Sequence, residues 1–428
     1  MNYQEFLAHI YQKYSGNVKL ELDRMVGLLG DLGHPEAALR GFHIAGTNGK
    51  GSVCATLEAL ALAHGLRTGM NTSPHLIDYT ERFRVEGREV GFERILEIFQ
   101  RHEELFAKWD ASFFEITTAI AFLLFQAEKL HTAVIEVGLG GRLDATNLFT
   151  PDVCAITTIG LDHVKTLGGT VELIAKEKAG IIKACIPVVL GKIERCPHKV
   201  ISAVAKQQGA PVYRWGRDFV SEFHQEGRLG LSFDYRFGDY EFKRLEANLL
   251  GTHQAINLSL ALTAFILYSE RRGFSISENA IRSALARVNW KGRMQILSFQ
   301  PVIIVDGAHN VQGVQALLNT LRHLYPRRKL NFLISILADK NYPEMIRLFC
   351  SKARKIYIAR NQSERAATAE EQAAVVRQCG VSFVAAASVA EAYQLARSEL
   401  KSSDVLVCGG SLFTVGEILQ VEEVRHLA

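Results

Sequence analysis

The sequence predicts an α/β protein of two domains, a larger one with a phosphate-binding loop and a smaller doubly wound one. Short apolar runs alternate with segments of helical periodicity along most of the 428 residues, which is typical of parallel sheets covered by helices. A chain of this length exceeds what one hydrophobic core usually supports. The alternation stops at residues 289–297 and then begins again. We therefore expect domains at 1–288 and 298–428, joined by a linker.

The segment Gly41–Leu60 (GFHIAGTNGKGSVCATLEAL) organises the first domain. An apolar run leads into a glycine-rich loop, after which apolar residues recur at helical spacing. Backbone N–H groups of such a loop turn toward an anion, and Lys50 can reach the terminal phosphates of a nucleoside triphosphate. A strict Walker pattern would need glycine at Ile44 and a hydroxyl at Gly51. A glycine turn that ends a buried strand is therefore the alternative.

The remaining elements follow from periodicity and from turn residues. In the first domain we expect helices at 3–14, 20–32, 92–108, 113–130, 171–183, 251–268 and 277–288. We expect strands there at 67–71, 132–137, 153–159 and 186–190, and an antiparallel appendage near 219–245, where short alternating runs are separated by glycines. In the second domain we expect strands at 302–305, 332–336, 355–358, 381–385 and 405–408, with helices between them.

Composition excludes several classes of protein. The net charge of +4 is weak and dispersed, so we expect no nucleic-acid partner. Seven cysteines without a C-x-x-C spacing predict neither a disulfide framework nor a zinc site, and favour a reducing compartment. The chain starts without a signal-peptide pattern and has no apolar run of membrane-spanning length. We expect a cytoplasmic protein with no membrane partner.

Polar side chains stand at or just after the ends of predicted strands. Ser73, Glu136 and His163 follow three strands of the first domain, and parallel strands end at one edge of a sheet. A hydroxyl and a carboxylate suit Mg²⁺ beside nucleotide phosphates, whereas imidazole is not a typical magnesium ligand. Taken alone, His163 is therefore better explained as a hydrogen-bonded histidine at a strand end. Glu136 is harder to dismiss, because a carboxylate in an apolar strand needs a partner.

Other polar residues allow two interpretations. On residues alone, Lys178 is a solvated helix lysine, and Ser112 with Glu115 forms a capping box. Asp306 and His309 follow a strand of the second domain and are candidates for a nucleotide site in a cleft between the domains. Arg293, in the linker, is explained equally well as a phosphate ligand or as a solvated arginine.

Eight motifs occur in register along nearly the whole chain: GTNGKGS, TSPH, IEVGLGGRLDATN, LDH, EKAG, HQAIN, GR and DGAHN. With them the chain resembles the folylpolyglutamate synthase and dihydrofolate synthase family, relatives of the muramyl-peptide ligases. The resemblance implies a Mur-ligase-like N-terminal domain with the P-loop and a Rossmann-like C-terminal domain. The form GTNGKGS stands in this family in place of the strict Walker pattern. Two departures are Val164–Gly169 after LDH, where the family is bulkier and more acidic, and Val311-Gln312 after DGAHN.

The resemblance also implies roles for individual residues. The residues implied to bind ATP are Thr47, Asn48, Gly49, Lys50, Gly51, Ser52, Asn257, Arg293 and Asp306. The implied magnesium ligands are Ser73, Glu136 and His163. Lys178 would be carried as a carbamate, and with Lys50 and His309 it completes the implied catalytic set. The residues implied on the pterin side are Ser112, Phe113, Phe114, Glu115, Leu143, Asp144 and Ala145.

The implied activity is ATP-dependent ligation of L-glutamate to dihydropteroate and to the glutamyl tail of reduced folates. An unactivated carboxylate does not form an amide in water, so it would first take the γ-phosphoryl group of ATP, and domain closure would protect the acyl phosphate. The form GGRLDATN favours the bifunctional bacterial type, and we expect a monomer. The alternatives are folylpolyglutamate synthase activity alone, another Mur-type amide ligase, or a nucleotide-dependent switch.

Overall fold

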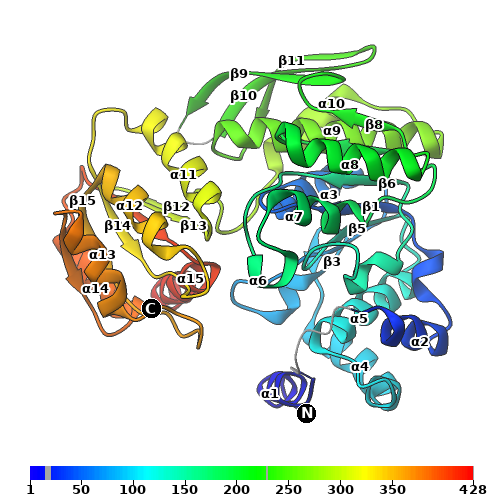
Figure 1. Ribbon diagram of the computed structural model, residues 1–428, viewed down its shortest axis with the longest axis horizontal. Coiled ribbons are helices and arrows are strands. Elements are labelled where there is room, and N and C mark those ends of the chain that lie inside the picture. Colours follow the sequence, from blue (N-terminus) through cyan, green and yellow to red (C-terminus); the bar gives the residue numbers. More distant parts are fainter. Residues whose placement is uncertain (15–20, 228–229, 428) are drawn as a thin grey trace. The chain divides into compact units, whose positions relative to one another are not determined.

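Two sheets made mainly of parallel strands support the fold (Figure 1). The computed structural model describes residues 1–14, 21–227 and 230–427. The α/β class predicted from the sequence is confirmed. The chain divides into two units, the first comprising Met1–Glu222, Phe233–Glu246 and Ala255–Val288, and the second Phe223–Ser232, Ala247–Gln254 and Asn289–Ala428. This division differs from a single boundary at residue 288, so the predicted domain limits stay a prediction.

The first sheet has eight strands in the order β4-β3-β2-β5-β1-β6-β7-β8. Their bounds are β1 Gly41–Ala45, β2 Thr68–Asn71, β3 Phe83–Val85, β4 Arg88–Glu89, β5 Thr132–Glu136, β6 Val153–Ile156, β7 Val188–Leu190 and β8 Val212–Arg214. Strands β2, β5, β1, β6, β7 and β8 pair in parallel, in that order across the sheet. Strands β3 and β4 extend the sheet beyond β2 with antiparallel pairing. Since β1 lies between β5 and β6, the ends of all three strands meet at one edge, where the P-loop begins.

Helices cover both faces of this sheet. They are α1 Tyr3–Tyr14, α2 Asp23–Asp31, α3 Lys50–Ala63, α4 Phe92–Lys108, α5 Phe113–Ala127, α6 Val164–Leu167, α7 Val171–Ala179, α8 Arg195–Gln207, α9 Thr252–Arg272 and α10 Glu278–Arg287. Short 3-10 turns add η1 Pro35–Ala38, η2 Tyr79–Arg82 and η3 Ala145–Leu148. Phe42 contacts Tyr268 of α9, with ring centroids 4.7 Å apart, whereas its neighbour His43 contacts Phe149. Successive residues of β1 thus face opposite layers.

Helix α7 ends earlier than predicted. The expected range was 171–183, but the helix stops at Ala179 and Gly180 is its C-cap. The backbone N–H of Arg142 donates to the carbonyl of Glu177 at 2.8 Å. A Cβ on Gly180 would lie 2.4 Å from the Cβ of Arg142. The glycine-rich loop after β5 therefore occupies the space that a longer helix would need.

A three-stranded sheet follows, with β9 Phe219–Gly227, β10 Gly230–Phe237 and β11 Tyr240–Ala247 in the order β11-β10-β9. It occupies the range of the predicted appendage. The division into units runs through its strands.

The second sheet has six strands in the order β12-β13-β17-β14-β15-β16. Its strands are β12 Gln295–Phe299, β13 Val302–Asp306, β14 Leu330–Ile334, β15 Ala353–Ile358, β16 Ser382–Ala385 and β17 Val405–Gly409. Its helices are α11 Val311–Leu324, α12 Tyr342–Lys352, α13 Ala369–Gln378, α14 Val389–Glu399 and α15 Leu412–Leu427. All pairs are parallel except β12 with β13. The predicted linker 289–297 therefore includes the start of a strand.

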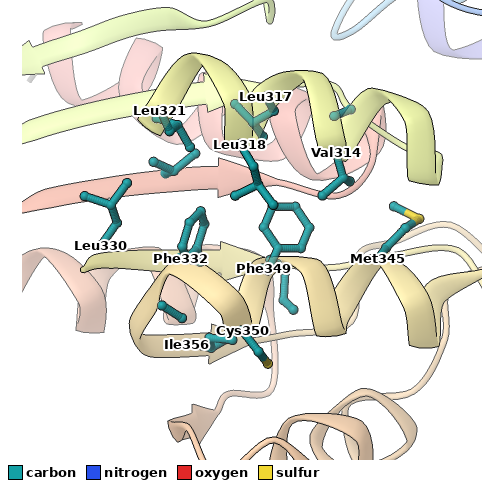
Figure 2. Packing of buried hydrophobic residues seen from close by; sticks show 14 of the residues in the cluster. Val314, Leu317, Leu318, Leu321, Leu330, Phe332, Met345, Phe349, Cys350 and Ile356 are labelled. Carbon is teal, nitrogen blue, oxygen red and sulfur yellow. The ribbon is translucent and has the colours of Figure 1, made fainter. Parts of the chain in front are cut away.

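Figure 2 shows the core of the second unit around α11. Val314, Leu317, Leu318 and Leu321 are buried at spacings of three and four residues, so they form one apolar face of the helix. This face packs with residues of β14 and α12, including Phe332. The sheet that carries Asp306 at one edge is thus covered by a buried apolar layer.

Candidate active site

The loop between β1 and α3 has the backbone conformation of a phosphate-binding loop. Gly49 is the N-cap of α3, with a φ of 91°, and Gly46 has a φ of 147°. A Cβ on Gly46 would lie 1.8 Å from Thr157 Oγ1, and one on Gly49 would lie 2.8 Å from Asn257 Oδ1. Both positions require glycine, for conformation and for space. The predicted residue Asn257 is therefore in contact with the predicted loop.

We predict that Gly46→Ala destabilises the protein by about 1–3 kcal/mol, because the backbone must shift to accommodate the methyl group. Thermal unfolding checks this prediction. Gly169→Ala is the matched control, since a Cβ there meets nothing within 4 Å. Equal unfolding temperatures for the two variants would show that the loop is not held as tightly as described.

The loop is fixed to the end of β6 by two threonines, Thr157 and Thr158, which no sequence motif predicts as site residues. The backbone N–H of Thr47 donates to the carbonyl of Thr158 at 2.8 Å, and that of Asn48 donates to Thr158 Oγ1 at 3.0 Å. Thr157 Oγ1 donates to the carbonyl of Asn48 at 2.6 Å. The only sequence signal was a run of hydroxyl side chains directly after an apolar strand.

Lys50, Glu136 and Ser73 lie together at this edge. Lys50 Nζ is 3.7 Å from Glu136 Oε1, and the side chain of Glu136 is 5% exposed. The backbone N–H of Ser73 donates to Glu136 Oε2 at 3.3 Å. Glu136 was predicted as a site residue because a carboxylate is costly to bury. Here that cost is offset by the Lys50 cation and by the hydrogen bond from Ser73. Gly51 and Ser52 lie in the first turn of α3, where Ser52 is buried.

His163 lies at the start of α6 in a left-handed conformation, with a φ of 49°. Its side chain is 41% exposed, and its Nε2 lies 3.9 Å from Asp162 Oδ1. Asp162, which was not among the predicted site residues, is buried. No described group of three or more histidine, cysteine, aspartate or glutamate side chains has the arrangement of a metal site. His163 as a metal ligand stays a prediction.

Lys178 is buried, which corrects the interpretation of a solvated helix lysine. The residue is 5% exposed, and its Nζ donates to the carbonyl of Gly46 at 3.0 Å. Burial, together with the positive charge of Lys50, lowers the pKa of Lys178 to about 7, while Asp162 and Asp144 act in the opposite direction. A large fraction of Lys178 is therefore a neutral amine near pH 7. The reason is non-local, because the P-loop covers this face of α7.

Two of the segments predicted on the pterin side meet at Gly138. A Cβ on this glycine would lie 2.4 Å from Phe114 Cζ, so the start of α5 touches the glycine-rich loop after β5. Asp144 closes that loop by accepting from the N–H groups of Leu139 and Thr146 at 2.8 and 3.1 Å, and burial raises its pKa. Ala145 begins the 3-10 turn η3, and Leu143 directly precedes Asp144, the N-cap of that turn.

The capping box predicted at Ser112 and Glu115 is confirmed. Glu115 Oε2 accepts from the N–H of Ser112 at 2.7 Å and from Arg24 at 3.1 Å. Phe113, at the first position of α5, stacks on Tyr11, with ring centroids 4.7 Å apart. A contact of these residues with a pterin stays a prediction.

In the second unit, Asp306 ends β13 and is buried. Its Oδ2 accepts from the N–H of Met294 at 2.9 Å, and its Oδ1 accepts from that of Ala308 at 2.9 Å. Arg293 Nη1 would be 2.2 Å from a Cβ on Gly307. The ring of His309 bonds the carbonyl of Gly307 through Nδ1 at 2.8 Å. The structure thus brings Arg293, Asp306 and His309 together around one turn, and their role toward ATP stays a prediction.

The sequence matches two family descriptions. Residues 44–265 match the Mur ligase middle domain, and residues 292–412 match the Mur ligase glutamate ligase domain. A Bacillus subtilis (strain 168) protein named dihydrofolate synthase/folylpolyglutamate synthase is 32% identical over 424 residues, or 97% of this chain and 98% of that protein. The chain belongs to the dihydrofolate synthase/folylpolyglutamate synthase family of Mur ligases. It is an ATP-dependent ligase.

Solved structures of this family have the same fold. An Escherichia coli structure described as FolC in complex with DHPP and ADP is 31% identical, with a TM-score of 0.89, and the match covers 100% of this chain and 99% of that one. A Yersinia pestis bifunctional folylpolyglutamate synthase/dihydrofolate synthase with Mn, AMPPNP and L-glutamate bound is 32% identical, with a TM-score of 0.88 and coverages of 99% and 98%. The Mur-ligase architecture implied by the motifs is thereby confirmed. Among the described helices, none has the length and apolar character needed to span a membrane.

Proposed function

We propose that this ligase adds L-glutamate to dihydropteroate and to the glutamyl tail of reduced folates, with ATP as the source of the phosphoryl group. The observation that carries the proposal is the cluster of Lys50, Glu136 and Ser73 beside a glycine loop at a strand edge. The Bacillus subtilis relative is named for both activities, and the family structures bind ADP, DHPP, an ATP analogue and L-glutamate. These small molecules are the proposed partners.

The chemistry follows from the electrophile that is needed. An oxygen of the acceptor carboxylate attacks the γ-phosphorus of ATP, the bond to ADP breaks, and an acyl phosphate forms. The amine of L-glutamate then attacks the acyl carbon, loses a proton, and inorganic phosphate leaves with the former carboxylate oxygen. Lys50 stabilises the charge that moves to the ADP leaving group, and most of the rate comes from positioning.

The donor set at this edge fits a divalent cation. Glu136 supplies a buried carboxylate, and Ser73, whose backbone N–H donates to that carboxylate, carries a hydroxyl. Mg²⁺ binds through one or two such oxygens together with substrate phosphates. We assign Ser73 and Glu136 as the ligands that would hold Mg²⁺, with His163 as the third group. When bound, the cation would neutralise phosphate charge during transfer.

Lys178 is proposed to carry a carbamate. A carbamate forms when a neutral amine attacks CO₂ and loses a proton, and Lys178 has both the lowered pKa and a protected site. The product would replace a cation near Lys50 by an anion. The carbamate would be favoured because the repulsion between the two lysine cations disappears and an attraction between the carbamate and Lys50 takes its place.

The other predicted site residues keep their implied roles in the proposal. ATP would be held by the backbone from Thr47 to Ser52, by Asn257, and by Arg293 and Asp306 of the second unit. The pterin would lie against Ser112–Glu115 and Leu143–Ala145. The proposed catalytic residues are Lys50, Lys178 and His309. His309 lies in the glutamate-ligase domain. Domain limits at 288 and 298 and a monomeric state belong to the same proposal.

The purified protein tests this proposal when it is incubated with ATP, magnesium and L-glutamate, together with dihydropteroate or a reduced folate. We expect ADP release with each acceptor and products one glutamate heavier by mass spectrometry. Activity with the reduced folate alone would restrict the enzyme to folylpolyglutamate synthesis. Absence of an amide product with both acceptors would favour another Mur-type substrate and overturn the proposal.

A further inference from the structure

Arg82 is a buried cation that the reaction scheme above does not use. It ends the 3-10 turn η2 and is 6% exposed. Its carbonyl accepts from Asn71 Nδ2 at 2.9 Å and from the N–H of Thr72 at 3.2 Å. Asn71 is the last residue of β2, and Thr72 directly precedes Ser73. The backbone of Arg82 is therefore fixed beside a proposed magnesium ligand.

The direct contacts that orient the guanidinium group are with His75, Phe113 and Tyr79. Its Nε donates to His75 Nδ1 at 2.9 Å, and its carbon lies 5.3 Å from the ring centroid of Phe113 and 5.9 Å from that of Tyr79. Within residues 1–14, 21–227 and 230–427, no carboxylate forms an ion pair with Arg82. The adjacent Glu81 uses its oxygens on the N–H groups that precede η2.

A buried guanidinium group without an ion-pair partner lowers the stability of the protein unless an anion binds to it. A buried charge normally has an opposite charge beside it, because the desolvation cost is several kcal/mol otherwise. The two terminal nitrogens of Arg82 have no hydrogen-bond partner in the described part of the chain, yet they are not sealed from solvent. Their N–H bonds are thus available in the fork that matches a carboxylate.

The surroundings identify which anion would bind. One neighbour of the guanidinium is Phe113, which stacks on Tyr11 and lies in the proposed pterin pocket. The charge of Arg82 also interacts with Glu136, which lies 3.7 Å from Lys50. Arg82 therefore lies between the pterin side and the phosphate side of one unit. The one anionic group of dihydropteroate is the benzoate carboxylate, which must reach this point to be phosphorylated.

We propose that Arg82 binds the carboxylate that accepts the phosphoryl group, and so positions each acceptor substrate for activation. This inference rests on the proposed function. It adds a substrate-binding residue on the acceptor side, where Phe113 provides an apolar wall and Arg82 the charge. The same oxygen-binding fork would serve the terminal γ-carboxylate of a folate tail.

The test compares Arg82→Met, which keeps the length and apolar contact of the side chain, with Arg82→Lys, which keeps the charge. We expect Arg82→Met to lower kcat/KM about 10- to 100-fold for dihydropteroate and for a monoglutamyl reduced folate alike, as for loss of a charged hydrogen-bonded pair. Arg82→Lys should recover part of that loss, and the KM for ATP should stay unchanged. Arg84→Lys is the matched control, because Arg84 already pairs with buried Glu58 at 2.9 Å.

Binding without turnover separates this inference from the proposed function. Pteroate and its carboxamide differ in the negative charge, so the wild-type protein should bind pteroate more tightly, and Arg82→Met should lose that preference while keeping its unfolding temperature. Unchanged kcat/KM, a loss confined to the glutamylated acceptor, or an equal loss for ATP would overturn the role of Arg82. An absence of wild-type ligase activity, with the pteroate preference intact, would overturn only the proposed function.

Discussion

Replacing Lys50 by alanine is expected to lower ADP formation and amide synthesis by at least about 10³-fold, because the variant lacks the charge that stabilises phosphoryl transfer. Lys50 opens α3 and points its ammonium group to within 3.7 Å of Glu136. Initial rates with saturating ATP, L-glutamate and dihydropteroate check the prediction. The loss should appear in kcat, since the interaction strengthens as charge develops in the transition state.

Two controls distinguish the loss of a catalytic charge from unfolding of the variant and from a general effect of removing a lysine. Removing Lys50 takes away the cation that lies 3.7 Å from Glu136, so thermal unfolding of the variant must show that the fold persists. Lys192→Ala removes an exposed lysine of the same unit and should leave the rate unchanged. A folded Lys50→Ala protein with wild-type activity would refute the assignment of the loop.

Replacing Lys178 by alanine is expected to lower kcat/KM about 100-fold, as is typical when a group that orients a metal site is removed. The loss should be partly reversed by acetate, because a small carboxylate can enter the space that the side chain leaves. Wild-type activity should also fall in buffers freed of CO₂ and return on addition of bicarbonate. This dependence should weaken below about pH 7, where protonation of Lys178 removes the nucleophilic amine.

Isotopically labelled bicarbonate gives a direct measurement of the carbamate. A carbamate carbon signal should appear in the NMR spectrum of the wild-type protein and be absent from Lys178→Ala. Lys176→Ala, an exposed lysine on the same helix, should behave like the wild type in both assays. Full activity of Lys178→Ala, or activity that ignores CO₂, would contradict the proposed role.

Local periodicity predicted most of the fold, because burial of one helix face leaves a direct pattern in the sequence. The spacing of Val314, Leu317, Leu318 and Leu321 is an example, and these residues form a continuous layer in Figure 2. The early end of α7 could not be predicted, since it depends on the N–H of Arg142 from another segment. The short edge strands β3 and β4 were likewise missed, because their charged sequence is typical of a loop and their pairing partners lie in other segments of the chain.

Site residues divide in the same way. Glu136 was identified from its own environment, as a carboxylate in an apolar strand, and its partner Lys50 was identified from the loop. The burial of Lys178 could not be identified from its own environment, because the carbonyl that its Nζ bonds belongs to Gly46, 132 positions away in the chain. Only the resemblance to a family selected this lysine. Neither the local sequence pattern nor the family resemblance identified Arg82 as a site residue. An arginine in a charged segment is normally solvated.

The transfer of one oxygen atom tests the central claim most directly. Dihydropteroate labelled in its carboxylate with the heavy isotope of oxygen is incubated with ATP and L-glutamate, and the inorganic phosphate is analysed by mass spectrometry. The account predicts one labelled oxygen in the phosphate for each amide bond formed, because the acyl phosphate leaves with a carboxylate oxygen. Amide formation with unlabelled phosphate would contradict it.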